Sequence, residues 1–237
     1  MVSGPPFHAF GLAHLTVIAI TVASPLVLAA VVKRSRWPGI ERVIAWALSG
    51  LLMANYLTYF LFVRKFNPAA WTETLPLHLC DWATLVVVIT MLTGSERCFE
   101  VAYFWGIGGT LQAIVTPNLP FGFPDLRFIS FFLAHSGIIV GIVFMMLVRK
   151  YRPYPMSIVR AFLWTELYFL FTYLYDRLTG ANFGFFLHKP AAFSLLSLLS
   201  DSHPVYLLQM HCLALIFFSA LYLPFAIFDL ARRTRVR

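Results

Sequence analysis

Long apolar stretches, each close to the length that crosses a lipid bilayer, most restrict what this chain can fold into. A membrane-spanning helix needs about 20 such residues, and about seven stretches of this kind follow one another along the sequence. Only 12% of the residues are charged and the mean hydropathy is +0.78, whereas soluble domains are about 25% charged. We therefore expect an all-α, polytopic membrane helix bundle whose apolar surface faces lipid. The expected spans are residues 10–32, 42–63, 75–94, 98–116, 127–148, 157–178 and 205–230.

The basic residues predict how the bundle is oriented. Most of the 18 lysines and arginines fall in segments on the side of the C-terminus, and loops rich in these residues stay in the cytoplasm. We therefore expect the N-terminus outside the cell membrane and the C-terminus in the cytoplasm. The larger set is Lys33, Arg34, Arg36, Arg42, Arg97, Arg149, Lys150, Arg152, Arg160, Arg232, Arg233, Arg235 and Arg237, and the smaller set is Arg64, Lys65, Arg127, Arg177 and Lys189.

No linker, low-complexity tract or repeat divides the chain, so residues 1–237 are expected to form a single transmembrane helical domain. The first apolar segment is not preceded by the basic residues of a signal peptide, so it is expected to be retained as a span. The net charge of +8 follows from the loop pattern. We therefore expect contact with membrane lipids and none with nucleic acid, and we predict no particular oligomeric state.

Polar residues gather at one predicted depth, which is unusual in apolar spans. Residues 75–82, LPLHLCDW, place a histidine, a thiol and a carboxylate at the head of the third span, where such groups are costly and often functional. A rise of about 1.5 Å per residue brings polar residues of five spans to this depth, in the outer leaflet. We predict a small polar pocket there. Its candidate members are His14, His78, Cys80, Asp81, Gln112, His135 and His211, with Asn182 from the long external segment of residues 179–204.

Simpler roles stay open for several of these residues. A lone histidine such as His14 or His211 is more often a packed side chain with a hydrogen-bond partner. Glu166, near the middle of the sixth span, is expected to be protonated or paired, and a structural role and a proton-relay role are equally compatible with its position. The four histidines of the spans lack the i,i+4 spacing typical of metal sites, so no metal or other cofactor is expected.

A thiol mechanism is the chemistry that these residues favour. At about 100° per residue, Cys80 lies about 200° from His78 around the third helix and lines up with Thr84. His78 is therefore a poor base for Cys80, and His135, at a similar depth on another span, is the better candidate. His78, Asp81 or Gln112 would then orient groups or donate to an oxyanion.

Several sequence blocks resemble a known group of membrane proteins. The blocks FGLAH, LPLHLC, GIGGTLQAIVTP, FGFPDLRF, FFLAHSG and NFGFFLHKP resemble the YwaF-like bacterial integral membrane proteins, which are related to the eukaryotic transmembrane-protein-164 family. This resemblance implies a lysophospholipid acyltransferase with a cysteine nucleophile, for which Cys80 matches the cysteine and His135 its partner. A phospholipid acyltransferase or hydrolase is thus the expected function. The alternatives are a small-solute or proton-coupled transporter and a non-catalytic lipid-binding membrane protein.

Overall fold

Helices make up nearly all of the regular structure. The computed structural model describes residues 4–66, 72, 75–117, 119–190 and 194–235. Within these ranges there is no strand, only an isolated bridge between Pro6 and Phe121. The helices are α1 (Leu12–Arg34), α2 (Ile40–Phe66), α3 (Leu79–Thr93), α4 (Glu96–Trp105), η2 (Gly106–Thr110), α5 (Leu111–Val115), α6 (Leu126–Arg149), α7 (Pro155–Thr179), η3 (Phe183–Phe185), η4 (Leu195–Leu198) and α8 (His203–Arg235). The expected all-α class is confirmed.

The helices reproduce the expected succession of spans. In the described residues, α1, α2, the continuous α4–η2–α5 segment, α6 and α8 are long and apolar enough to cross a membrane. Helix α3 is shorter, and α7 carries more polar residues. The chain is therefore a multi-pass membrane protein, whereas the orientation of its termini stays a prediction.

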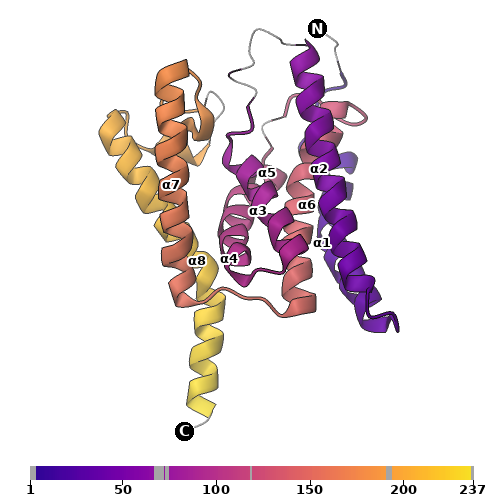
Figure 1. The fold of residues 1–237 in the computed structure, drawn as a ribbon. Coiled ribbons are helices and arrows are strands. Elements are labelled where there is room, and N and C mark those ends of the chain that lie inside the picture. The colour runs from indigo at the N-terminus through magenta and orange to yellow at the C-terminus, as the bar shows by residue number, and fades with distance from the viewer. Residues whose placement is uncertain (1–3, 67–71, 73–74, 118, 191–193, 236–237) are drawn as a thin grey trace.

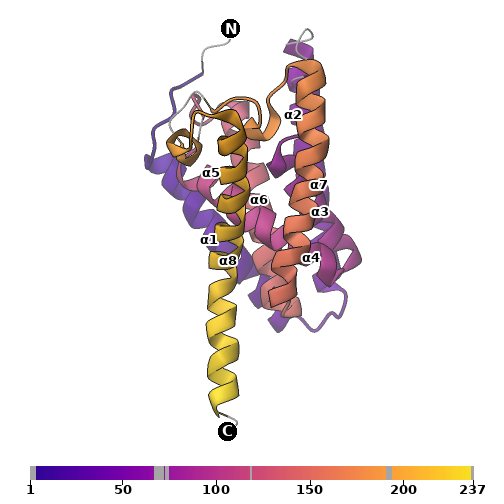
Figure 2. The same ribbon diagram turned by 90° about the vertical axis from the view of Figure 1, so that its left-hand side faces the viewer.

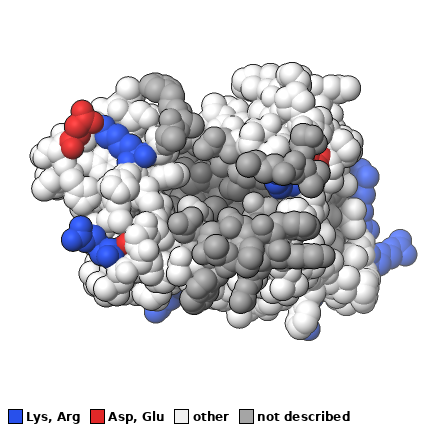
Figure 3. Space-filling model, turned by 90° about the horizontal axis from the view of Figure 1, so that it is seen from above, with Lys and Arg blue, Asp and Glu red and all other residues white. Residues whose placement is uncertain are grey.

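One helix lies at the centre of the bundle. Helix α6 packs against α1, α2 and α3, while α7 and α8 form a pair on the other side of α3 and α4 (Figure 1). The lower half of α8 extends beyond the other helices (Figure 2). We call the end where α1, α3 and α6 begin the Cys80 end. Most of the described surface at this end is uncharged (Figure 3).

Small residues allow the helices around α6 to approach closely. A Cβ added at Gly137 would lie 2.5 Å from Leu52 Cδ2 of α2, and one at Gly141 would lie 2.8 Å from Val87 Cγ1 of α3. The two glycines are one turn apart on α6, but Gly137 allows α2 to approach closely and Gly141 allows α3 to do so. Asn55 of α2 donates to the carbonyl of Ser130 at 3.1 Å, which adds a polar tie to α6.

Two details differ from the predicted spans. The third span was expected to begin at residues 75–76 with Pro76 in its first turn, but α3 begins at Leu79. The reason is local, because the Asp81 carboxylate accepts the backbone N–H of His78 at 3.0 Å and caps the helix there. The fourth span contains a π turn, η2, where the i→i+5 pattern widens the helix.

Ion pairs hold the opposite end together. Arg160 of α7 donates to both carboxylate oxygens of Glu100 on α4, at 2.6 and 2.7 Å. Arg149 pairs with Glu41, and Arg152 pairs with Asp229. These ion pairs join α4 to α7, α2 to α6, and α8 to the loop between α6 and α7, at the side where most basic residues were expected.

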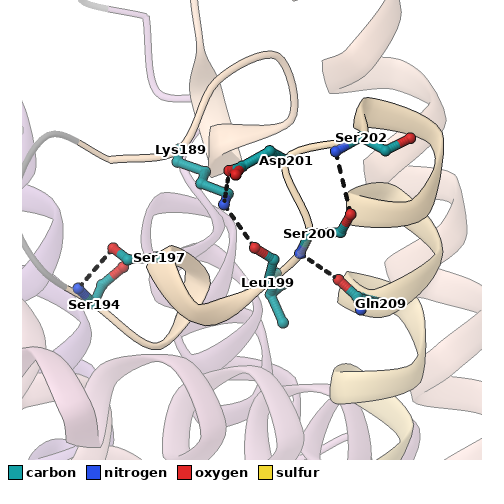
Figure 4. Close-up of polar contacts among 8 residues, drawn as sticks. All are labelled: Lys189, Ser194, Ser197, Leu199, Ser200, Asp201, Ser202 and Gln209. Atoms are coloured by element: carbon teal, nitrogen blue, oxygen red, sulfur yellow. Dashed lines mark hydrogen bonds and ion pairs between the residues drawn. The ribbon is translucent and has the colours of Figure 1, made fainter.

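The connection from α7 to α8 is tied down by its own polar groups (Figure 4). Lys189 donates to the carbonyl of Leu199 at 2.6 Å and to Asp201 at 2.7 Å, and Gln209 of α8 accepts the N–H of Ser200 at 2.7 Å. The hydrogen bond from Lys189 lowers the pKa of Asp201. These contacts fold the described residues of the connection, 180–190 and 194–202, against the Cys80 end, and we call these residues the strap.

Candidate functional site

The start of α3 carries three of the predicted site residues. His78 is the residue just before the helix, Cys80 lies in its first turn, and Asp81 caps it. Thr84 Oγ1 donates to the Cys80 carbonyl at 2.9 Å, one turn along the same face. Helical geometry predicted that Cys80 and Thr84 share one face of the helix and that His78 does not lie on it. In the structure Cys80 and Thr84 are one turn apart on α3, and His78 precedes the helix.

Cys80 is half-buried among α2, α6 and α7. Its face of α3 continues through Thr84 to Val87, which meets Gly141 of α6. Tyr56 of α2 and Tyr168 of α7 both lie within electrostatic reach of Cys80 and Asp81. The thiol therefore sits where three helices meet, near the positive end of the α3 dipole.

His135 lies on α6 at a comparable depth. Helices α3 and α6 begin at the same end, and the Val87–Gly141 contact sets their register. Seven residues back from that contact, Cys80 comes level with the residue before His135. The His135 ring, however, shares a face with Ile138, which packs against Gly106 of η2. In the described part of the chain no hydrogen bond joins Cys80 and His135, so their pairing stays a prediction.

The hydrogen bond of the His135 ring selects its tautomer. Nδ1 lies 2.7 Å from the carbonyl oxygen of Phe131. A carbonyl only accepts, so Nδ1 carries the hydrogen and Nε2 keeps a lone pair. Within the described residues nothing bonds to Nε2. His135 thus has the form that a general base requires, oriented by a backbone group.

His14 has the opposite arrangement and a structural role. Its side chain is 1% exposed. Nδ1 accepts the N–H of Phe10 at 2.9 Å, so Nε2 carries the hydrogen and donates to the carbonyl of Ile114 at 2.7 Å. Both ring nitrogens are occupied, and the ring joins the start of α1 to the end of α5. The simpler interpretation, a packed histidine with partners, holds for His14.

A hollow of about 330 Å³ opens beside His78. It is lined by His78 and by Gly180, Ala181, Asn182 and Phe183 of the strap. The His78 ring packs edge-on against Phe183, with the ring centroids 4.9 Å apart. His78 is therefore the titratable side chain that lines this hollow.

Asn182 and Gln112 are not available to a ligand in the hollow, because Asn182 bonds to the backbone and Gln112 lies elsewhere. The Asn182 amide accepts the N–H groups of Leu187 and His188 and donates to the His188 carbonyl, which closes a loop. Gln112 is exposed on α5. No group of three or more histidine, cysteine, aspartate or glutamate side chains lies close enough to hold a metal in the described ranges.

Glu166 and His211 are brought together across α7 and α8. Glu166 Oε2 lies 3.1 Å from His211 Nε2, so this carboxyl has a partner on α8. The sequence had grouped His211 with the residues around Cys80. The structure instead gives it a partner on α7.

The family can be stated from a comparison with known proteins. The model of the TMEM164 family matches residues 9–222, which is most of the chain. The chain belongs to the TMEM164 family. Searches of curated proteins and of solved structures find no match. The matched range includes α1 to α7 and every candidate residue from His14 to His211, so the whole Cys80 end lies inside the family's shared region.

Sequence reasoning missed one residue of this TMEM164-family site. Asp176, near the end of α7, is not among the candidates of the sequence analysis, but it is fully buried, and its carboxylate oxygens form no hydrogen bond of normal geometry in the described structure, although the backbone N–H of Phe183 lies close to it. Thr172, one turn earlier, is also fully buried with an unpaired hydroxyl. Tyr168, one turn earlier again, donates to the Leu77 carbonyl at 2.9 Å. The four-residue spacing of these side chains was the signal available in the sequence.

Proposed function

We propose that this chain is a thiol-dependent phospholipid acyltransferase or hydrolase that works within the membrane at its Cys80 end. One observation supports the proposal: Cys80 lies in the first turn of α3, level with the part of α6 that carries His135, and the hydrogen bond of His135 Nδ1 leaves its Nε2 lone pair without a partner in the described residues. A cysteine needs an adjacent base to become nucleophilic in apolar surroundings. Membership of the TMEM164 family is consistent with such a role.

The reaction would proceed in two acyl transfers. His135 Nε2 removes the proton from the Cys80 thiol, and the thiolate sulfur attacks the ester carbonyl of a phospholipid. The ester C–O bond breaks, and the lysophospholipid alkoxide leaves with the proton from His135. A second lysophospholipid hydroxyl, or water, then gives its proton to His135 and attacks the thioester, which releases the thiolate.

The two side chains must approach each other for the first step. Hydrogen bonds of catalytic groups are often long in the free enzyme and shorten when substrate binds. His78, which lines the hollow beside α3, is the side chain that we expect to bind the polar part of such a substrate.

Labelling of Cys80 in membranes tests this proposal. A lipid-like electrophile is expected to modify the wild type at Cys80, and His135→Ala should slow this modification at least tenfold because the general base is lost. Cys98 and Cys212 serve as internal controls for thiol access. His203→Ala is the matched control, since that histidine also bonds to a backbone carbonyl but belongs to α8.

Two results would reject the thiol mechanism. One is equal modification of Cys80 in the wild type and in His135→Ala, and the other is acyl transfer that survives Cys80→Ser. If Glu166→Gln abolishes the cellular function while Cys80→Ser is silent, transport becomes the favoured function. If neither change has an effect in a folded protein, a non-catalytic lipid-binding role is favoured.

A further inference from the structure

The turn that joins α1 to α2 carries a group of basic side chains at the end of the molecule opposite the Cys80 end (Figure 1). Four basic side chains are exposed there, those of Lys33, Arg34, Arg36 and Arg42. Among the described residues none of the four forms an ion pair. We call residues 33–42 the basic turn. It presents positive charges that no acidic side chain of the described structure pairs with.

Most acidic residues of this end are engaged elsewhere. Glu41 lies inside the basic turn, but it pairs with Arg149 of α6. The other two ion pairs of this end join α4 to α7 and α8 to the loop before α7. The remaining acidic residue of this end, Glu96, lies in the first turn of α4. The positive charge of the basic turn is therefore available to an anion from outside the chain.

Hydrogen bonds fix the shape of the basic turn. The N–H of Ser35 donates to the carbonyl of Val31 at 2.9 Å, and Ser35 Oγ accepts the N–H of Trp37 at 3.1 Å. The N–H of Ile40 donates to the Trp37 carbonyl at 3.2 Å. The indole ring packs on Gly39, where an added Cβ would lie 3.1 Å from Trp37 Cε2. The turn thus holds an indole ring, in a residue that is 56% exposed, beside its basic side chains.

The length of α1 determines the depth of the basic turn in the bilayer. Helix α1 has 23 residues, so it is about 34 Å long, slightly more than the hydrocarbon core of about 30 Å. Its first charged residue is Lys33, next to its last residue. Charged side chains avoid hydrocarbon, and tryptophan favours the level of the headgroups. The basic turn therefore lies among the lipid headgroups, where phosphate groups are the neighbouring anions.

We propose that the basic turn binds the headgroup of an acidic phospholipid, whose phosphate has no ammonium group to balance it. Guanidinium groups bind phosphate oxygens through pairs of N–H donors, which suits Arg34 and Arg36. A zwitterionic headgroup brings its own cation, so it gains less from the unpaired charges of the turn. The site goes beyond the proposed acyl transfer, because it lies at the other end of the bundle and uses neither Cys80 nor His135.

The apolar surface of α1 favours a phospholipid over a free anion. Only 11% of the most apolar window of α1 is buried by the rest of the chain. Val27 and Val31 are 59% and 43% exposed, and at steps of four and three residues they share a helix face with Arg34. An acidic lipid can place its acyl chain along these valines and its phosphate at Arg34. A free phosphate ion makes only the second contact.

Thermal unfolding of the full chain in neutral detergent micelles, titrated with phosphatidylglycerol, tests the proposal. A ligand of the folded state raises the unfolding midpoint, so added lipid should stabilise the wild type. Each basic residue near an acidic headgroup contributes about fivefold in affinity, so Arg34→Gln with Arg36→Gln should raise the lipid concentration needed about 25-fold. Lysine at both positions keeps the charge and should retain most of the binding. Arg97→Gln with Arg232→Gln is the matched control, because it removes the same charge from this end outside the basic turn.

The outcomes separate this site from its alternatives. An equal response to phosphatidylglycerol in the wild type and in the double glutamine variant would overturn the proposal, as would an equal loss of response in the matched control. Phosphatidylcholine or inorganic phosphate that stabilises the wild type as strongly would also overturn it, since the first has no net charge and the second no acyl chain. Arg34→Gln and Arg36→Gln alone should each shift the titration about fivefold, so they replace a double variant that fails to fold. The measurement does not involve Cys80, so it is independent of the acyl transfer.

Discussion

Replacing Gly141 by alanine should separate α3 from α6 and weaken the fold. An added Cβ would lie 2.8 Å from Val87 Cγ1 and 3.2 Å from Met91 Sδ. The Met91 side chain is flexible, but Val87 is β-branched and 1% exposed, so it cannot turn away. Overpacking of this kind costs about 1–3 kcal/mol.

A matched control isolates that cost. Gly50 of α2 has nothing within 4 Å of an added Cβ, so Gly50→Ala should only gain helix propensity, by up to about 1 kcal/mol. Gly141→Ala gains the same helix propensity, but its added Cβ also crowds Val87, which lowers the free energy of unfolding. The difference between the two variants in free energy of unfolding should therefore be about 1–3 kcal/mol.

The assay is equilibrium unfolding of both variants in mixed micelles, with Cys80 modification measured in parallel. Helix α3 carries Cys80, so Gly141→Ala should also slow modification of Cys80. Gly137→Ala displaces Leu52 of α2 instead and should lower stability with a smaller effect on the thiol. If Gly141→Ala is as stable as Gly50→Ala, the close approach of α3 and α6 is not the packing constraint described above.

Three further substitutions have defined outcomes. His14→Ala should lower the free energy of unfolding by about 2–4 kcal/mol, because it leaves the Ile114 carbonyl unpaired and opens a cavity; a loss below 1 kcal/mol in thermal or detergent unfolding would contradict this. The hydrogen bond from Arg127 lowers the pKa of Asp125, so its stabilisation is present above about pH 4 and is lost as the pH falls through the lowered value. An acid titration of stability in which Arg127→Gln shows the wild-type profile would disprove that. Asp176→Asn should raise the free energy of unfolding by about 1–3 kcal/mol, since it removes a buried carboxylate that lacks a partner in the described structure, and a less stable variant would indicate that the carboxylate has a ligand.

The positions of the helices could be read from the sequence to within a few residues. Every backbone polar group in a bilayer core must be satisfied inside its own helix, so a span must be a continuous apolar run. The face shared by Cys80 and Thr84 also followed from helical geometry alone. The exception was the start of α3, where the cap formed by Asp81 outweighed the preference of Pro76 for a first turn.

The partners of the polar residues were decided only by the tertiary structure. His14, His135 and His211 look alike in the sequence, yet one ring is fully bonded, one has a nitrogen without a partner in the described residues and one lies against Glu166. The burial of Asp176 likewise depends on how α7 packs against the strap and α3. Apolar length is a local property of the chain, so the sequence determines the spans. A hydrogen bond joins residues from distant parts of the chain, so it is determined only when the helices pack.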